Sequence, residues 1–137
     1  MNRLITLVYE KNHYLEKFYA CGEAEMTQFL QGHYEGLESF YQNREKILEM
    51  IRYVDAQIEK NHEKVRLTDY EKREFRKAMT IKDEYVQRIV DQDLQILSCI
   101  ERAKSDIIQD LQNLKKGKKA MAGYKMPSFT NRLDEEA

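Results

Sequence analysis

Two pairs of residues have the spacing of a known metal-binding motif. Glu10 precedes His13 by three positions, and Glu59 precedes His62 by the same interval. In ferritin-like proteins, Glu-x-x-His pairs that face inward from two helices bind metal ions together with further glutamates. Here both pairs lie among polar residues, and no further carboxylates on the predicted apolar faces complete a ligand set. We therefore predict solvated helix surfaces at these positions and no metal site.

Catalytic motifs are missing from the sequence. It has no P-loop, no G-x-S-x-G motif and no dinucleotide-binding fingerprint, and none of its four serines neighbours a histidine. Cys21 and Cys99 fall within helical patterns far apart in the chain, and we expect both to be free thiols because no secretion signal accompanies them. The sequence thus predicts neither an enzyme nor a bound cofactor.

A run of lysines near the C-terminus could instead bind phosphate groups. It comprises Lys115, Lys116, Lys118 and Lys119. Cations at the C-terminal end of a helix also offset the helix dipole, and no recognition helix or aromatic-interleaved basic sheet accompanies this run. The whole chain has 23 basic and 24 acidic residues, so it lacks a global field that would attract nucleic acid or an anionic membrane. We predict neither partner.

The composition indicates the kind of fold that positions these residues. The 137 residues suffice for one domain, and 34% charged residues with a single proline and five glycines favour long helices. The mean hydropathy of −0.78 indicates a mostly charged surface with narrow apolar seams. No apolar run approaches the ~20 residues that span a bilayer, and the N-terminal sequence does not resemble a signal peptide. We expect a cytoplasmic, all-α, elongated antiparallel bundle.

Apolar residues three or four positions apart predict three helices, at about residues 4–31, 34–62 and 69–116. Gly22 interrupts the first apolar face and weakens that helix by up to ~1 kcal/mol relative to alanine. Two glycines in QGHYEG, residues 31–36, separate the first two helices, and Thr68 with Glu71 fits a capping box at the start of the third. If the first break stayed helical, residues 4–58 and 69–125 would instead form a long two-helix coiled-coil hairpin.

The long third helix is predicted to complete a single helical domain, residues 1–116. Val90, Leu94 and Leu97 broaden its apolar face between residues 86 and 100. A broad face suits contact with two neighbours, so we expect this part to meet both earlier helices. The part beyond Ile100 has a narrower face and is expected to extend past them. From Gly117 onward, residues 117–137 are predicted to form an irregular basic and polar tail.

Arg44 and Asp93 each occupy a position where the apolar repeat would place a hydrophobic residue. In an antiparallel arrangement that turns near residue 65, the two lie within about one helical turn of each other. We predict that they form a polar pair in the seam. Such a pair can fix the register of the helices, although it is weak evidence for added stability.

The apolar face of the third helix continues into the part expected to lack helical neighbours. Contiguous exposed apolar surface commonly marks an interaction site, and a partner helix could lay its own apolar face there. The tail, residues 121–133, or a second copy of the chain could cover the same surface instead. The predicted binding residues are Ile100, Ile107, Ile108, Leu111 and Leu114.

Two stretches resemble a known family. LQGHYEGLESFYQNREKIL, residues 30–48, is similar to a glycine, acidic and aromatic break followed by a helix with leucine and arginine. DQDLQILSCIERAKSDIIQDLQNLKKGKKAMAGY, residues 91–124, is similar to a long last helix that ends in basic residues and a tyrosine. Together they resemble the FlgN/FliT-like flagellar type III export chaperones, which are small all-helical cytosolic proteins. His33 stands where an acidic residue is common in that family.

The resemblance implies a non-enzymatic chaperone. Its client would be the C-terminal helical segment of a hook-associated or filament-cap protein, which it would deliver to the export gate. The resemblance also implies that Tyr124, after the basic run, takes part in docking on the gate. The alternative is a structural coiled-coil protein that associates with itself and needs no client, and a homodimer is compatible with either function.

Overall fold

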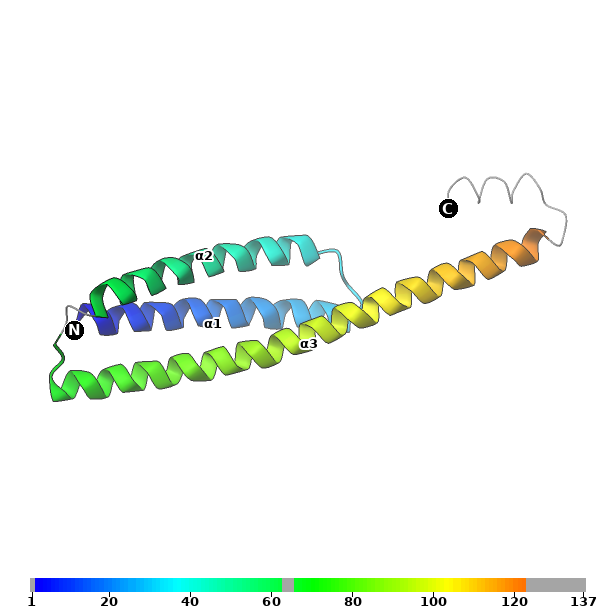
Figure 1. Ribbon diagram of the computed structural model, residues 1–137. Helices are drawn as coiled ribbons and strands as arrows, with labels where there is room; N and C mark the ends of the chain where they lie inside the picture. The colour runs from blue at the N-terminus through cyan, green and yellow to red at the C-terminus, as the bar shows by residue number, and fades with distance from the viewer. Residues whose placement is uncertain (1, 63–65, 123–137) are drawn as a thin grey trace. The chain divides into compact units, whose positions relative to one another are not determined.

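A computed structural model describes residues 2–62 and 66–122, and Figure 1 shows its three helices. They are α1 (Arg3–Leu30), α2 (Leu37–His62) and α3 (Asp69–Ala122), and the described residues contain no strand. The predicted all-α fold with three helices and a long last helix is therefore confirmed. The chain divides into two compact units, residues 1–99 and 100–137, and this division differs from the single domain predicted for residues 1–116.

In the first unit, α1 lies between α2 and α3 (Figure 1). Hydrogen bonds show that α1 and α3 run in the same direction. The Tyr9 hydroxyl donates to Glu74 Oε2 (3.4 Å), and further along both helices Gln92 Nε2 donates to the carbonyl of Tyr19 (2.9 Å). α2 runs antiparallel to both, so consecutive helices form an up-down-up arrangement.

The turn between α1 and α2 excludes the fused two-helix alternative. Gly32 has a φ of +79°, a left-handed conformation that glycine adopts without steric cost. Its amide donates to the carbonyl of Phe29 (3.0 Å), and the His33 amide donates to that of Gln28 (2.9 Å). This pair of bonds is the Schellman motif that ends many helices. α1 therefore ends at Leu30, and the prediction of one long hairpin is wrong.

α3 begins with the predicted capping box. The Glu71 amide donates to the Thr68 hydroxyl (3.2 Å), and the Thr68 amide donates to the Glu71 carboxylate (3.1 Å). The two bonds satisfy backbone donors that the start of a helix leaves free. Hydrogen bonding to Thr68 holds the pKa of Glu71 below its ordinary value. The bond with the Thr68 backbone has the larger effect, and the bond with its side chain has the smaller one.

α1 supplies most of the hydrophobic core of the first unit. Because α1 contacts α2 on one side and α3 on the other, it needs a broad apolar face, whereas each outer helix buries a narrower one. The buried hydrophobic residues are Leu4, Ile5, Leu7, Val8, Leu15, Phe18 and Phe29 in α1, Phe40, Ile51 and Val54 in α2, and Ala78 and Ile96 in α3.

Two buried amides and two small residues form the contact between α1 and α3. Asn12 Nδ2 donates to the carbonyl of Ala78 (3.0 Å). Gln92 lies against Gly22, where a Cβ atom would overlap its side-chain amide, and both Asn12 and Gln92 are buried. Gly22 therefore allows close packing of α1 against α3. The sequence alone predicts only that Gly22 weakens the helix.

One face of α3 packs within the first unit, and the adjacent face does not. Ala78, Gln92 and Ile96 are buried, and intervals of 14 and 18 residues return to nearly the same side of an α-helix. The prediction that the broad apolar face meets both α1 and α2 holds only in part, because this face and α2 line an open groove that leaves much of the face exposed. The hydrophobic residues that remain 41–63% exposed on this adjacent face are Val86, Val90, Leu94 and Leu97.

In the second unit, α3 continues from Ile100 to Ala122. The predicted boundary at Gly117 is therefore wrong, since residues 117–122 are helical. A lone glycine costs only ~1 kcal/mol in a helix, and the lysines and alanines around it favour the helix. Among the residues that the structure describes, no helix combines the length and apolarity needed to cross a membrane.

Candidate functional site

An open apolar groove lies between α2 and α3, and residues of α1 contribute to its lining. Its volume is about 370 Å³. Such a surface can accept the apolar face of a helix, and it contains no catalytic arrangement of side chains. We call it the central groove and define it by Leu15 and Phe18 from α1, Leu48 and Ile51 from α2, and Val86, Ile89 and Val90 from α3.

Arg44 connects all three helices at one end of the central groove. Its Nη2 atom lies 2.5 Å from Asp93 Oδ1 of α3. Its guanidinium lies over the ring of Phe18 in α1, 4.4 Å from the centroid, and over that of Phe40 in α2, at 5.0 Å. Such cation–π contacts stabilise a partly desolvated guanidinium. The predicted pairing of Arg44 with Asp93 is confirmed, and its role in setting the register stays a prediction.

A second ion pair, between Lys11 and Asp55, stands further along the groove. Lys11 Nζ lies 2.6 Å from Asp55 Oδ1. In both pairs the cation is the less exposed partner: 20% against 46% for Lys11 and Asp55, and 13% against 42% for Arg44 and Asp93. The groove therefore presents two carboxylates to solvent at its rim, where they retain capacity to accept hydrogen bonds.

Cys21, a free thiol, is affected by the same arginine. Burial raises the pKa of the Cys21 thiol, the positive charge of Arg44 opposes that shift, and the negative charge of Glu25 adds to it. A raised pKa keeps the thiol protonated near neutral pH, and the thiolate is the reactive form. Burial therefore disfavours the reactive thiolate form of Cys21.

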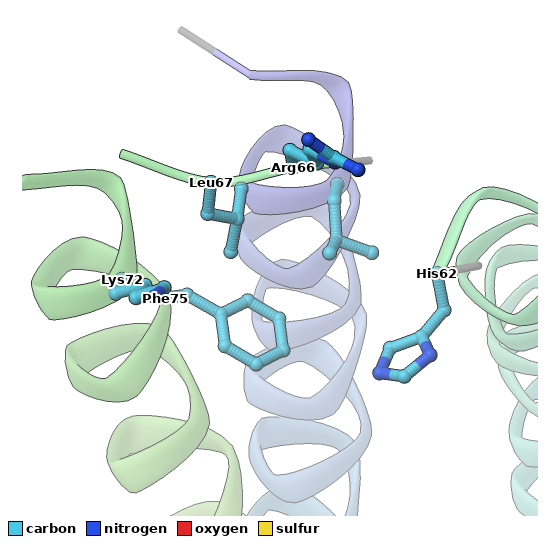
Figure 2. Close-up of a pocket in the computed structure, with 6 residues that line it drawn as sticks. His62, Arg66, Leu67, Lys72 and Phe75 are labelled. Carbon is cyan, nitrogen blue, oxygen red and sulfur yellow. The ribbon is translucent and has the colours of Figure 1, made fainter. Parts of the chain in front are cut away.

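A second cavity, of about 450 Å³, lies where α1 begins, α2 ends and α3 begins. Figure 2 shows His62 of α2 and Phe75 of α3 pointing into it from opposite sides. Its lining is partly basic, with His62, Arg66 and Lys72, and all three of these side chains are exposed. Exposed charges in water contribute little to binding, so this cavity is a poorer candidate than the central groove.

The two Glu-x-x-His pairs do not form part of a ligand cluster. Within residues 2–62 and 66–122, no group of three or more histidine, cysteine, aspartate or glutamate side chains is placed to hold a metal ion. The fold does bring the two pairs to the same end of the first unit, because the start of α1 lies beside the end of α2, where Lys11 pairs with Asp55. Even so, these side chains are not placed as a metal-ligand group.

In the second unit, four of the five predicted binding residues are exposed. Ile107, Ile108, Leu111 and Leu114 are between 48% and 59% exposed, and we call these four the apolar strip. Ile100 is only partly exposed. Their spacing places them along one side of α3. The strip is thus an apolar surface on a described helix, and whether it binds a partner stays a prediction.

Three further residues bear on the candidate sites. Tyr124, predicted to dock on the export gate, lies outside the residues that the structure describes. Sequence reasoning did not single out Val86 and Val90 as exposed groove residues. Their spacing of four residues, continued to Leu97, was the available signal, because this series is offset from the buried positions Gln92 and Ile96.

Comparisons with known proteins do not identify the chain. No family model matches it, and no curated protein or solved structure is found to match.

Proposed function

We propose that this chain is a non-enzymatic export chaperone that binds an amphipathic helix on the apolar strip of α3. The client is the C-terminal helical segment of a flagellar hook-associated or filament-cap protein, held in the cytoplasm before export. The exposure of the strip supports the mode of binding. The resemblance of residues 30–48 and 91–124 to the FlgN/FliT-like chaperones supports the choice of client.

The observation that carries this proposal is the half-exposed state of four large aliphatic side chains on one helix. Fully burying such a side chain contributes ~1.5–3 kcal/mol, so covering four half-exposed ones contributes on the order of 4 kcal/mol. Association itself costs about as much or more. The client must therefore make further contacts beyond the strip, as a long amphipathic helix does.

Delivery to the export gate involves a separate site in this proposal. Tyr124 follows the basic run and is the residue that the family resemblance assigns to gate docking. A Tyr124→Ala variant is therefore expected to retain the client and to lose binding to the cytosolic part of the gate. Loss of both interactions together would contradict a separate role for this residue.

Coexpression tests the proposed function. The chain is coexpressed with the C-terminal segments of the hook-junction and cap proteins from the same genome, and the purified complexes are weighed by native mass spectrometry. We expect a defined complex with at least one of these segments. The absence of any complex, together with a stable homo-oligomer, would contradict the chaperone function.

A structural coiled-coil protein without a client is the second candidate. The three-four spacing of exposed apolar residues along α3 favours it, because such seams also drive helices of identical chains together. The two candidates differ in how mass depends on concentration. A purely structural protein forms a stable oligomer on its own, whereas a chaperone exchanges its partner for a client.

A further inference from the structure

The central groove has a regular pattern of charge and apolarity along its length. On α2, Arg44, Leu48 and Ile51 line the groove, and Asp55 follows at the same four-three-four spacing. Arg44 holds Asp93 and Asp55 holds Lys11, so a half-exposed carboxylate marks each end. Arg44 and Asp55 are eleven residues apart, which is about 16 Å along a helix. The groove is therefore apolar in the middle, with an ion pair at each end in which the carboxylate is the more exposed partner.

A segment of the second unit carries the complementary pattern. Lys104, Ile108, Leu111 and Lys115 have the same four-three-four spacing, and all four are exposed. Eleven residues are three helical turns, so both lysines lie on the same side as Ile108 and Leu111, about 16 Å apart. Residues 100–122 contain six basic and three acidic residues, which gives this part of α3 a net positive charge.

We propose that the central groove of one copy binds residues 104–115 of a second copy. Ile108 and Leu111 cover the apolar floor and walls, and Lys104 and Lys115 reach the carboxylates of Asp55 and Asp93 at the rim. The incoming helix completes a four-helix bundle, which the first unit lacks. The segment comes from another copy because Val90 and Leu111 belong to one continuous helix, and a helix does not lie beside itself.

This contact joins two different surfaces of the chain. It gives a closed dimer, and not an open chain of copies, only if each copy inserts its segment into the groove of the other. The expected product is a reciprocal dimer of twice 16.4 kDa. The dimer would cover Ile108 and Leu111, which belong to the apolar strip. In that one respect the inference rests on the proposed function: a client helix competes with the second copy for the strip, so self-association keeps the strip covered until a client arrives.

Self-association of the full chain alone tests the inference, by sedimentation equilibrium over a range of concentrations. We expect the wild type to shift from monomer to dimer mass. Val90→Glu, on an exposed wall of the groove, and Leu111→Glu, on the strip, should each give monomer mass. An equimolar mixture of the two variants should form more dimer than either variant alone, because one of the two contacts in the mixed dimer joins an intact groove to an intact strip.

Controls on the same helix separate these effects from the added charge. Gln95→Glu and Asn113→Glu place a carboxylate on other sides of α3 and should dimerise like the wild type.

Leu48→Glu, on the α2 wall of the groove, is a second groove variant and should also give monomer mass. Circular dichroism melts confirm that each variant is folded. Lys104→Glu with Lys115→Glu should weaken the dimer at low salt, and the difference should shrink at high salt because salt screens rim charges.

Three results would overturn the inference. A wild type that stays monomeric at every concentration has no such contact. A mixture of Val90→Glu and Leu111→Glu that forms no more dimer than either variant alone would show that the groove and the strip do not bind each other. Dimerisation unchanged by both groove variants would show that the groove takes no part. Because no client is present in these experiments, each result leaves client binding to be judged by the coexpression experiment alone.

Discussion

Gly22 of α1 and Gln92 of α3 fit together because the glycine has no side chain. The Gln92 amide occupies the space where a Cβ of residue 22 would be. From there its Nε2 atom donates to the carbonyl of Tyr19 (2.9 Å) and to the carboxylate of Glu23 (3.0 Å). A buried amide that loses such bonds costs about 1–3 kcal/mol. The contact of Gln92 with α1 therefore holds α1 and α3 at a defined register.

The effect of Gly22→Ala is predicted to change sign with residue 92. In the wild type the new methyl group displaces the buried amide, and we expect a net loss of about 1 kcal/mol despite the higher helix propensity of alanine. In a Gln92→Ala background the space is free, and Gly22→Ala should stabilise the protein by up to ~1 kcal/mol. Urea unfolding of the four variants measures this coupling as a double-mutant cycle. Equal effects in both backgrounds would contradict the fit.

Asp93→Leu is predicted to destabilise the protein more than Arg44→Leu. The first change leaves the guanidinium, the more buried partner, without its carboxylate, at a cost of about 1–3 kcal/mol. The second leaves a carboxylate that is already half hydrated, and the leucine still packs near Phe18 and Phe40. The double variant should regain most of the lost stability, because no charge is left unpaired. Chemical unfolding of all four proteins provides the comparison.

The same double variant tests whether the pair sets the register of α2 and α3. Spin labels at Glu49 and Gln87, in a chain with Cys21 and Cys99 replaced by serine, report the distance between the two helices. We expect one narrow distribution with the pair and a broader one in the Arg44→Leu, Asp93→Leu variant, since apolar seams slip more easily. Identical distributions and identical assembly states would rule out the register role.

The capping box of α3 is predicted to contribute stability that depends on pH. The pKa of Glu71 is lowered by its hydrogen bonds from Thr68, so the folded state binds this proton less readily than the unfolded chain. The contribution is therefore complete above the ordinary glutamate pKa and is lost as the pH falls through the lower, folded-state value. Thr68→Ala should cost about 1 kcal/mol at neutral pH.

Two variants at residue 71 isolate the titrating group. The stability difference between wild type and Glu71→Ala should shrink in acid as the wild-type carboxylate becomes protonated. Glu71→Gln keeps a hydrogen-bond acceptor that does not titrate, so its stability should lack this component of the pH dependence. A Glu71 pKa at its ordinary value, measured by NMR titration, would show that the box does not form in solution.

The reactivity of Cys21 is predicted to follow the charges around it. In a Cys99→Ser background, alkylation rates against pH give the pKa of Cys21, which should lie above that of an unfolded cysteine because of burial. Arg44→Leu removes a neighbouring positive charge and should raise the pKa of Cys21 further, whereas Glu25→Gln should lower it. The opposite order would mean that Arg44 does not face the thiol.

Local signals in the sequence were enough to predict where most helices begin and end. Gly32 is the residue that the left-handed end of α1 requires, and Thr68 with Glu71 forms the start of α3. Both are interactions within a few residues, so they depend little on the rest of the fold. The pairing of Arg44 with Asp93 was predictable because an antiparallel register follows from helix lengths and one turn.

Features that depend on how helices approach each other were not predictable from periodicity. The sequence pattern around a glycine in an apolar face is the same in two cases. The glycine can simply weaken the helix, or it can, like Gly22, leave room for a side chain of a neighbouring helix. Val90 satisfies an apolar pattern equally well in a closed seam and on the wall of an open groove. Gly117 illustrates a third case, since a glycine ends a helix only when further hydrogen bonds like those around Gly32 favour the end.

The measurement that most directly tests the central claim is the affinity of the client segment for two matched double variants. Ile107→Asp with Leu111→Asp places two carboxylates on the apolar strip, and Gln109→Asp with Asn113→Asp places two on other sides of the same helix. Titration calorimetry with the hook-associated or cap segment should show binding lost in the first variant and retained in the second. Equal binding by both variants would contradict the strip as the client site.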